Sequence, residues 1–391
     1  MAHPNPALWN KSFVFACLGY LLMAFPFYML LPTMPVYLTE VLGMNTAWVG
    51  VALSSYTLGV CCVRPFSGYL VDCFDRKPLY ITAFAVFAAL FAGYLAAATV
   101  LTVMLVRFLQ GMAMGVTSVS GNTIAIDVIP SERRGEGIGF YGFTLNLAMS
   151  LAPLVAVILY NRYGFQSMTA VCIVIALAGV LSATRIRTPR KEKRARPPFS
   201  LDRFILVRAI PTGIVYLLCS VSYGMIVSFA VLYGKENGVH NPGYFFIYLA
   251  VGVSVVRLFS GRLADKGKVH PLAIGSIVAL TASLVVFALV RTPFVFFAMA
   301  LVLGMCFGTM VPAFQYLVVN VAAPDRRGTA NSTYLTSFDL GSGAGMLIAG
   351  FVAAHASIGT AYLAGVGCAL LAVIIYVRFA RRAYEKYRID R

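Results

Sequence analysis

The stretch Val63-Arg64-Pro65-Phe66-Ser67-Gly68-Tyr69-Leu70-Val71-Asp72-Cys73-Phe74-Asp75-Arg76-Lys77-Pro78 ends a long apolar run in a short charged turn. This boundary is typical of a helix that leaves a bilayer, because charges are costly in hydrocarbon and frequent in the loops beside it. The stretch Val256-Arg257-Leu258-Phe259-Ser260-Gly261-Arg262-Leu263-Ala264-Asp265 repeats the pattern at an offset of 261 − 68 = 193 residues. The chain therefore carries the same membrane boundary twice.

The offset of 193 also holds outside these two stretches. Gly111 and Gly115 map onto Gly304 and Gly308, and the turn Glu132-Arg133-Arg134-Gly135 maps onto Asp325-Arg326-Arg327-Gly328. An accidental match would drift along the chain, whereas an internal repeat keeps its register. Two halves that run in the same direction, with matching charged turns, are typical of a transporter built from parallel repeats.

The composition indicates an integral membrane protein. Of the 391 residues, 60% are hydrophobic and only 12% are charged, and the mean hydropathy is +0.83. This is too much apolar surface for a water-soluble fold of this length. The apolar residues come in blocks of about 20, which favours helical spans over the alternating segments of about 10 residues in an outer-membrane barrel.

Dividing the chain at charges, Gly and Pro predicts an all-α membrane protein with twelve transmembrane helices in two pseudo-symmetric six-helix bundles. The expected spans are roughly 12 to 36, 47 to 71, 78 to 98, 101 to 126, 136 to 160, 166 to 184, 209 to 233, 243 to 264, 271 to 290, 294 to 320, 329 to 354 and 359 to 377. Residues 1–184 are then the N-terminal bundle, residues 185–208 a basic cytoplasmic linker and residues 209–391 the C-terminal bundle.

Lys and Arg gather on one side of these spans, and only Arg162, Lys235 and Arg291 fall between spans on the other side. The positive-inside rule places both termini and the repeated turns in the cytoplasm of a multi-pass protein of the plasma (inner) membrane. The net charge of +17 therefore reflects topology, and we expect no nucleic-acid partner. Anionic headgroups explain the basic linker, with a lipid-regulatory or nucleic-acid role as the alternative.

The cysteines and histidines indicate neither a metal site nor a disulfide framework. Seven of the eight cysteines fall inside predicted spans and only Cys73 lies in a turn, which favours buried free thiols. No group of Cys and His has the spacing of metal ligands, so we expect no metal and no cofactor. The spans also lack the nucleophile, base or metal constellation of an enzyme, and the chain lacks a phosphate-binding loop for ATP-driven pumping.

Three segments resemble the major facilitator superfamily. Gly68 to Asp72 followed by Arg76-Lys77-Pro78 is similar to the cytoplasmic signature between spans 2 and 3, although Cys73 and Asp75 depart from the usual pattern. Arg107-Phe108-Leu109-Gln110-Gly111 resembles a signature of the proton-coupled members. Leu31-Pro32-Thr33-Met34-Pro35 resembles the twelve-span drug-efflux branch, whose Gly-Pro signature in span 5 is here Ala152-Pro153. The resemblance implies a monomeric secondary transporter whose partners are a small-molecule substrate, protons and the lipid bilayer.

The repeated turns predict a cytoplasmic gate. Asp72 and Asp265 stand near helix ends, where they can meet helix N-termini or the arginine pairs of the following turns. The alternative is that these are ordinary interfacial charges. The expected gate residues are Gly68, Asp72, Arg76, Lys77, Gly261, Asp265, Arg133, Arg134, Arg326 and Arg327.

Ionisable residues within spans are functional candidates, because each is costly at the bilayer centre. Asp339 lies about ten residues, roughly 15 Å, into span 11, in a segment that we expect to be glycine-dense enough to loosen the helix and to admit water or a neighbouring helix. We expect Asp339 and Arg107 to serve proton coupling and Asp339 to form an inter-half salt bridge with Arg64. The alternative for Asp339 is a purely structural partner of a buried arginine.

Polar side chains elsewhere in the spans are candidates for a substrate cavity, and for each of them taken singly hydrogen bonds between helices are the favoured alternative. The cavity candidates are Arg107, Asn122, Asn146, Tyr223 and Gln315. The function that these features favour is proton-coupled efflux of a small amphipathic or organic molecule by alternating access. The alternatives are proton-coupled uptake of a small metabolite and export of a lipid-like substrate, whereas no filter loop or charged ring indicates a channel.

Overall fold

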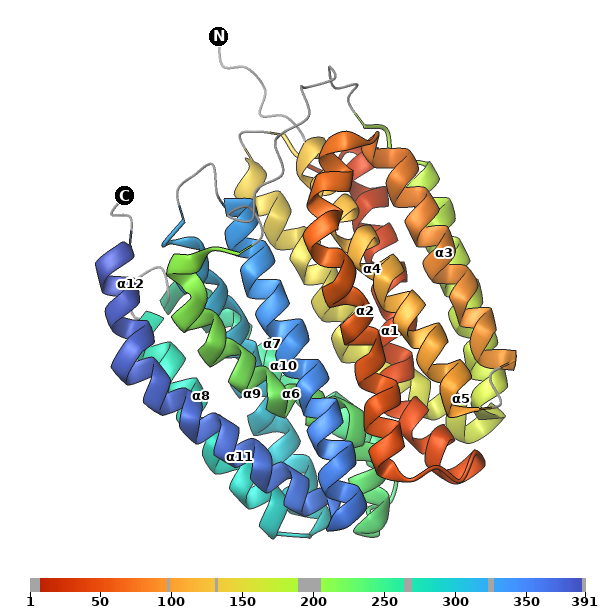
Figure 1. Ribbon diagram of the computed structural model, residues 1–391, viewed down its shortest axis with the longest axis vertical. Helices are drawn as coiled ribbons and strands as arrows, with labels where there is room; N and C mark the ends of the chain where they lie inside the picture. Colours follow the sequence, from red (N-terminus) through yellow and green to blue (C-terminus); the bar gives the residue numbers. More distant parts are fainter. Residues whose placement is uncertain are drawn as a thin grey trace. The chain divides into compact units, whose positions relative to one another are not determined.

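A computed structural model describes residues 8–96, 99–130, 133–188, 205–263, 269–322 and 327–388. Every regular element in these ranges is a helix, as Figure 1 shows, so the predicted all-α class is confirmed for the described part of the chain. The elements are α1 (Lys11–Val36), η1 (Tyr37–Val41), α2 (Thr46–Cys73), α3 (Arg76–Ala96), α4 (Val100–Val128), α5 (Arg134–Thr184), η4 (Val207–Ala209), α6 (Ile210–Glu236), η5 (Pro242–Tyr244), α7 (Phe245–Leu263), α8 (Val269–Leu289), α9 (Pro293–Val319), α10 (Arg327–His355), α11 (Ile358–Ile375), η8 (Tyr376–Ala380) and α12 (Arg381–Tyr387).

Ten helices among the described residues are long and apolar enough to cross a membrane. The difference from twelve has two sources. The spans expected at 136–160 and 166–184 both lie in α5, whose 51 residues are interrupted at Gly164, where φ is 78° and ψ is 176°. The span expected at 243–264 corresponds to η5 and α7, whose apolar part, Pro242–Val256, is shorter than a helix that crosses a membrane. A straight helix of the length of α5 would measure about 77 Å, more than twice the thickness of the hydrocarbon core. The count of twelve stays a prediction.

The chain divides into two compact units. Unit 1 takes the described residues of Met1–Thr33 and Leu58–Phe199, and unit 2 takes those of Met34–Thr57 and Ser200–Arg391. Residues 34–57, which the predicted boundaries assign to the N-terminal bundle, are thus part of unit 2. Residues 189–204, most of the predicted linker, lie outside the described ranges. The boundaries at 184 and 208 stay a prediction.

Helix packing within each unit follows the internal repeat. In unit 1, a Cβ added to Gly59 of α2 would lie 2.1 Å from the carbonyl oxygen of Phe108 in α4. In unit 2, a Cβ added to Gly252 of α7 would lie 2.1 Å from the carbonyl oxygen of Leu301 in α9. Both residues of the second contact are 193 positions beyond those of the first (252 − 59 and 301 − 108). The two helix pairs therefore cross in the same register, so closely that only glycine fits.

A stacked pair of tyrosines also recurs in the two units. Tyr20 of α1 stacks on Tyr141 of α5 with ring centroids 4.4 Å apart, and Tyr216 of α6 stacks on Tyr334 of α10 at 4.7 Å. Tyr141 and Tyr334 are 193 residues apart, whereas Tyr20 and Tyr216 are 196 apart. The first helix of each half thus follows the repeat with a shift of three residues.

Candidate functional site

A buried polar cluster lies in unit 1 around Arg107. Arg107 and Gln110 stand one turn apart on α4, and both side chains are fully buried. Tyr94 of α3 donates a hydrogen bond to Gln110 Oε1 at 2.7 Å, and Arg107 interacts with the same tyrosine. The guanidinium carbon of Arg107 lies 5.9 Å from the ring centroid of Phe27 in α1. Because a buried charge is costly unless it has partners, phenol and aromatic face together stabilise this cation.

The cluster offers cationic and amide donors inside an apolar bundle, which is the chemistry that holds a carboxylate or another anionic group. The side chain of Arg107 is fully buried and is not exposed to a cavity among the described residues. Its predicted place in the lining of a substrate cavity therefore stays a prediction. Gln110 Nε2 is buried without a hydrogen-bond partner among the described residues. Tyr94 and Gln110 were not among the predicted site residues. The spacing of three between Arg107 and Gln110 was the available signal for Gln110.

The charged turn between α2 and α3 contributes an ion pair within unit 1. Arg76, the first residue of α3, donates from Nη1 to Asp127 Oδ2 near the end of α4. Both side chains are largely buried, so the pair is less screened than a surface pair. Asp127 was not predicted as a site residue because span 4 was expected to end at residue 126, whereas α4 continues to Val128. This pair joins the start of α3 to the end of α4.

The other predicted gate residues are only partly described. Gly68 and Asp72 lie in α2, Gly261 lies in α7, Arg134 begins α5 and Arg327 begins α10, and Lys77 and Arg133 are half-buried. Asp265 and Arg326 lie outside the described residues. The predicted pairing of Asp72 and Asp265 with the arginine pairs stays a prediction.

In unit 2, the glycine-dense segment around Gly341 admits a neighbouring helix. A Cβ added to Gly341 would lie 2.1 Å from the carbonyl oxygen of Leu217, and one added to Gly345 would lie 2.0 Å from that of Val221. Both carbonyls belong to α6. Helix α10 continues through the segment from Arg327 to His355. The expected close approach of another helix is confirmed at these glycines.

Asp339 stands on α10 just before this glycine segment and is half-buried. Its neighbour Phe338 packs against Tyr223 of α6, with ring centroids 5.1 Å apart. Tyr223 also contacts Phe307 of α9, edge to face, at 5.2 Å. Asp339 is therefore the residue that follows a member of an aromatic cluster of unit 2 along α10.

The remaining candidates are dispersed over the two units. Arg64 of α2 and Asn122 of α4 are half-buried and belong to unit 1, as does Asn146 of α5, whereas Gln315 of α9 is exposed and belongs to unit 2. Neither the cavity formed by Asn122, Asn146, Tyr223 and Gln315 nor the Arg64–Asp339 salt bridge is tested by the described contacts. Both stay predictions.

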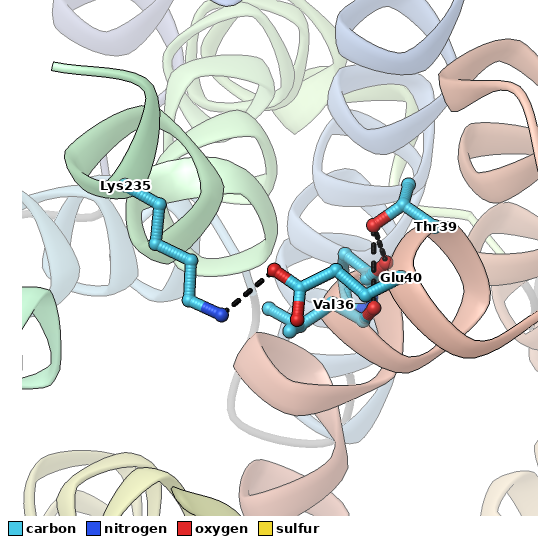
Figure 2. Close-up of polar contacts among 5 residues, drawn as sticks. Val36, Thr39, Glu40 and Lys235 are labelled. Atoms are coloured by element: carbon cyan, nitrogen blue, oxygen red, sulfur yellow. Dashed lines mark hydrogen bonds and ion pairs between the residues drawn. The ribbon is translucent and has the colours of Figure 1, made fainter. Parts of the chain in front are cut away.

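Unit 2 contains an ion pair that sequence reasoning missed. Figure 2 shows Lys235 Nζ in the last turn of α6 donating to Glu40 Oε1 at 2.8 Å. Glu40 lies in the π-helical turn η1, where the Thr39 hydroxyl donates to the carbonyl oxygens of Pro35 at 2.9 Å and Val36 at 3.2 Å. The two charges are 195 residues apart in sequence. Their occurrence on the side that carries few charges was the only available signal.

Residues 34–57 also pack on α10 within unit 2. A Cβ added to Gly50 of α2 would lie 2.6 Å from the carbonyl oxygen of Met346, and one added to Gly350 would lie 2.4 Å from that of Thr46. Thr57 lies directly against Gly343. The order of these contacts shows that α2 and α10 run antiparallel here. We use the name unit-2 clasp for the Glu40–Lys235 pair together with this glycine crossing.

Long apolar helices, a parallel internal repeat and buried charges within the helices define a membrane transporter of the repeat-built kind. The family model of the Major Facilitator Superfamily matches residues 16–344 and 212–390. The chain belongs to this superfamily.

Three similar proteins illustrate the range of the family. YhhS, an MFS-type transporter of Escherichia coli K12, is 23% identical over 373 residues, covering 91% of this chain and 89% of that protein. The staphylopine export protein of Staphylococcus aureus Mu50 is 24% identical over 358 residues, covering 86% and 87%. A bacterial homologue of the human lysosomal transporter Spinster, solved in an inward-facing and occupied conformation, has a TM-score of 0.82 at 13% identity and covers 99% of this chain and 100% of that one. The last likeness shows the fold.

Proposed function

We propose that this transporter exports a small amphipathic or organic molecule in exchange for protons, as a monomer in the inner membrane with both termini in the cytoplasm. The observation that carries the proposal is the half-buried acid Asp339 inside the membrane helix α10. An acid within a membrane helix is costly and is the group expected to carry a proton. The similar staphylopine export protein supports the outward direction.

In this proposal Arg107 is the fixed cation of the N-terminal half. Its contacts with Tyr94 and Phe27 hold the guanidinium in one place within unit 1. An arginine remains charged at any physiological pH and presents a planar fork of donors. We assign it to the anionic group of a substrate or to the coupling carboxylate, both of which would be neutralised by it.

Arg64 is the proposed partner of Asp339. Arg64 is seven residues beyond Thr57 on α2, and Asp339 is four residues before Gly343 on α10. Since Thr57 contacts Gly343, continuation of the same antiparallel register would leave a difference of three residues, or roughly 4.5 Å of helix rise. An arginine side chain spans that distance. This count supports the pair.

The pair gives a simple coupling step. While Asp339 is ionised, its attraction to Arg64 would hold the two halves in one arrangement. When Asp339 takes a proton, the attraction is lost and the halves are free to change arrangement. Release of that proton on the cytoplasmic side restores the pair, so that one proton enters for each outward passage. The same group thus responds to the pH gradient and to the state of the transporter.

The test uses proteoliposomes with an imposed pH gradient and a panel of amphipathic organic cations and organic anions, with a trapped pH dye as readout. Compounds that collapse the gradient only in the presence of protein identify a coupled substrate. Asp339→Asn should abolish gradient-driven transport but keep exchange of labelled for unlabelled compound. The control is Asp75→Asn, which neutralises an exposed carboxylate in the charged turn and should leave both activities intact.

Full gradient-driven transport by the Asp339→Asn variant would overturn the coupling role. Transport of every active compound in the uptake direction, down the same gradient as the proton, would replace export by uptake.

A further inference from the structure

We propose that the C-terminal segment of residues 376–388 binds the headgroups of anionic phospholipids. This segment, which we call the basic helix, comprises η8, α12 and Arg388. It continues directly from α11, and the candidate span Ile358–Tyr387 is 30 residues long. A helix of that length measures about 45 Å, whereas the hydrocarbon core is about 30 Å thick. About ten residues therefore extend beyond the hydrocarbon, at the level of the headgroups.

One face of the basic helix is fixed against unit 2. Tyr376, Ala380 and Tyr384, spaced by four residues, are all buried. His270 at the start of α8 hydrogen-bonds through Nδ1 to the Tyr376 hydroxyl at 2.7 Å. The ring of Tyr384 lies edge to face with the same histidine, with centroids 5.1 Å apart. The opposite face of the helix is thereby directed away from the unit.

That opposite face is strongly basic. Five exposed cations lie within eleven residues, namely Arg378, Arg381, Arg382, Lys386 and Arg388. The acid among them, Glu385, is engaged by His270 Nε2 and by Arg388 Nη1, each at 3.1 Å. No carboxylate of the described residues pairs with the other four cations. The face therefore carries excess positive charge at the depth where lipid phosphates lie.

Two large exposed apolar side chains distinguish the basic helix from an ordinary run of charges in solvent. Val377 is 47% exposed and Phe379 is 59% exposed, and the two flank Arg378, the first cation of the segment. Apolar groups beside arginines are typical of segments that lie in the membrane interface. Guanidinium groups bind phosphate oxygens with paired hydrogen bonds. The combination fits a phospholipid with a net negative headgroup, such as phosphatidylglycerol.

The experiment measures lipid binding to the purified full chain by native mass spectrometry, with phosphatidylglycerol and phosphatidylcholine as probes. The test variant is Arg378→Gln/Arg382→Gln. The matched control is Arg162→Gln/Arg291→Gln, which removes the same charge from two exposed arginines that fall between predicted spans on the other side of the membrane. Each juxtamembrane cation contributes about fivefold to anionic-lipid affinity. We therefore expect phosphatidylglycerol binding to weaken by about 25-fold in the test variant and by less than threefold in the control, with phosphatidylcholine binding unchanged.

Equal weakening in the two double variants would overturn the proposal, as would equal affinity of the unmodified protein for the two lipids. Effective competition by soluble glycerol phosphate would also overturn it, because the site would then recognise free phosphate instead of a lipid surface. None of these results depends on transport, so failure here is distinguishable from failure of the proposed export function.

Discussion

Replacing Gly59 or Gly252 by alanine should destabilise the transporter by similar amounts, because the two glycines occupy the same helix crossing in the two units. Each added methyl would lie 2.1 Å from a backbone carbonyl oxygen, Phe108 O for Gly59 and Leu301 O for Gly252. Ordinary van der Waals contacts begin near 3.4 Å. The helices would therefore have to separate by about 1.3 Å (3.4 − 2.1) at the crossing, since a backbone atom cannot move aside like a side chain.

The expected change in the free energy of unfolding follows from two opposing effects. Overpacking of a well-packed interior costs about 1–3 kcal/mol. Replacing glycine by alanine within a helix raises the free energy of unfolding by up to about 1 kcal/mol, because alanine restricts the unfolded chain. Where a glycine has open space at the Cβ position, alanine stabilises the helix without overpacking it. The free energies of unfolding of the crossing and control variants should therefore differ by about 1–3 kcal/mol. In a unit of roughly 200 residues each kcal/mol shifts the melting temperature by about 2–4 °C.

The assay is thermal unfolding of the detergent-purified variants, followed by the loss of monodisperse protein after heating. Gly142→Ala is the control for Gly59→Ala in unit 1, and Gly275→Ala is the control for Gly252→Ala in unit 2, since nothing lies within 4 Å of a Cβ at either control position. A crossing variant as stable as its control would refute the close approach. Destabilisation at only one of the two crossings would refute the equivalence of the two helix pairs.

Three further variants test the site. Arg107→Ala should abolish transport of an identified substrate while the yield of folded protein is retained. Arg107→Lys should support little transport, because lysine lacks the planar fork of donors. Normal transport by the alanine variant would contradict the role assigned to Arg107. Asp127→Asn should lower the melting temperature by several degrees, because it leaves the largely buried Arg76 without its carboxylate, and Arg76→Gln combined with it should add little; additive effects in this cycle would show that the pair is not coupled. Glu40→Lys should lower the melting temperature slightly, because it replaces an exposed ion pair worth about 0–1 kcal/mol by two like charges. The charge swap Glu40→Lys/Lys235→Glu should restore the melting temperature, and no restoration would show that the pair does not stabilise unit 2.

The repeat predicted more of the packing than the apolar pattern did. A constant offset of 193 relates residues that must occupy equivalent positions, and the carbonyl contacts of Gly59 and Gly252 follow it. Apolar runs, by contrast, state only that a segment can be helical. They do not distinguish two spans from one long element interrupted at Gly164, because the interruption depends on a single backbone conformation. The number of membrane spans was therefore predicted less securely than the packing of the helices.

The missed ion pairs have different physical causes. Asp127 was overlooked because α4 extends two residues beyond the expected end, and a carboxylate at a helix end is indistinguishable in sequence from one in a loop. The Glu40–Lys235 pair joins residues 195 positions apart. No periodicity connects such residues, so only the folded arrangement brings them together. The link between Tyr94 and Gln110 was closer to prediction, because the two residues belong to helices that are consecutive in the chain, α3 and α4.

The two components of the unit-2 clasp differ in strength. The Glu40–Lys235 pair is well exposed, with 47% and 35% of the side chains accessible, and a pair of this kind contributes about 0–1 kcal/mol. The crossing of Gly50 and Gly350 brings backbone against backbone and adds dispersion contacts that depend on an exact fit. Within unit 2 the close glycine crossing fixes residues 46–57 against α10, whereas the exposed ion pair adds only a small contribution to the stability of that contact.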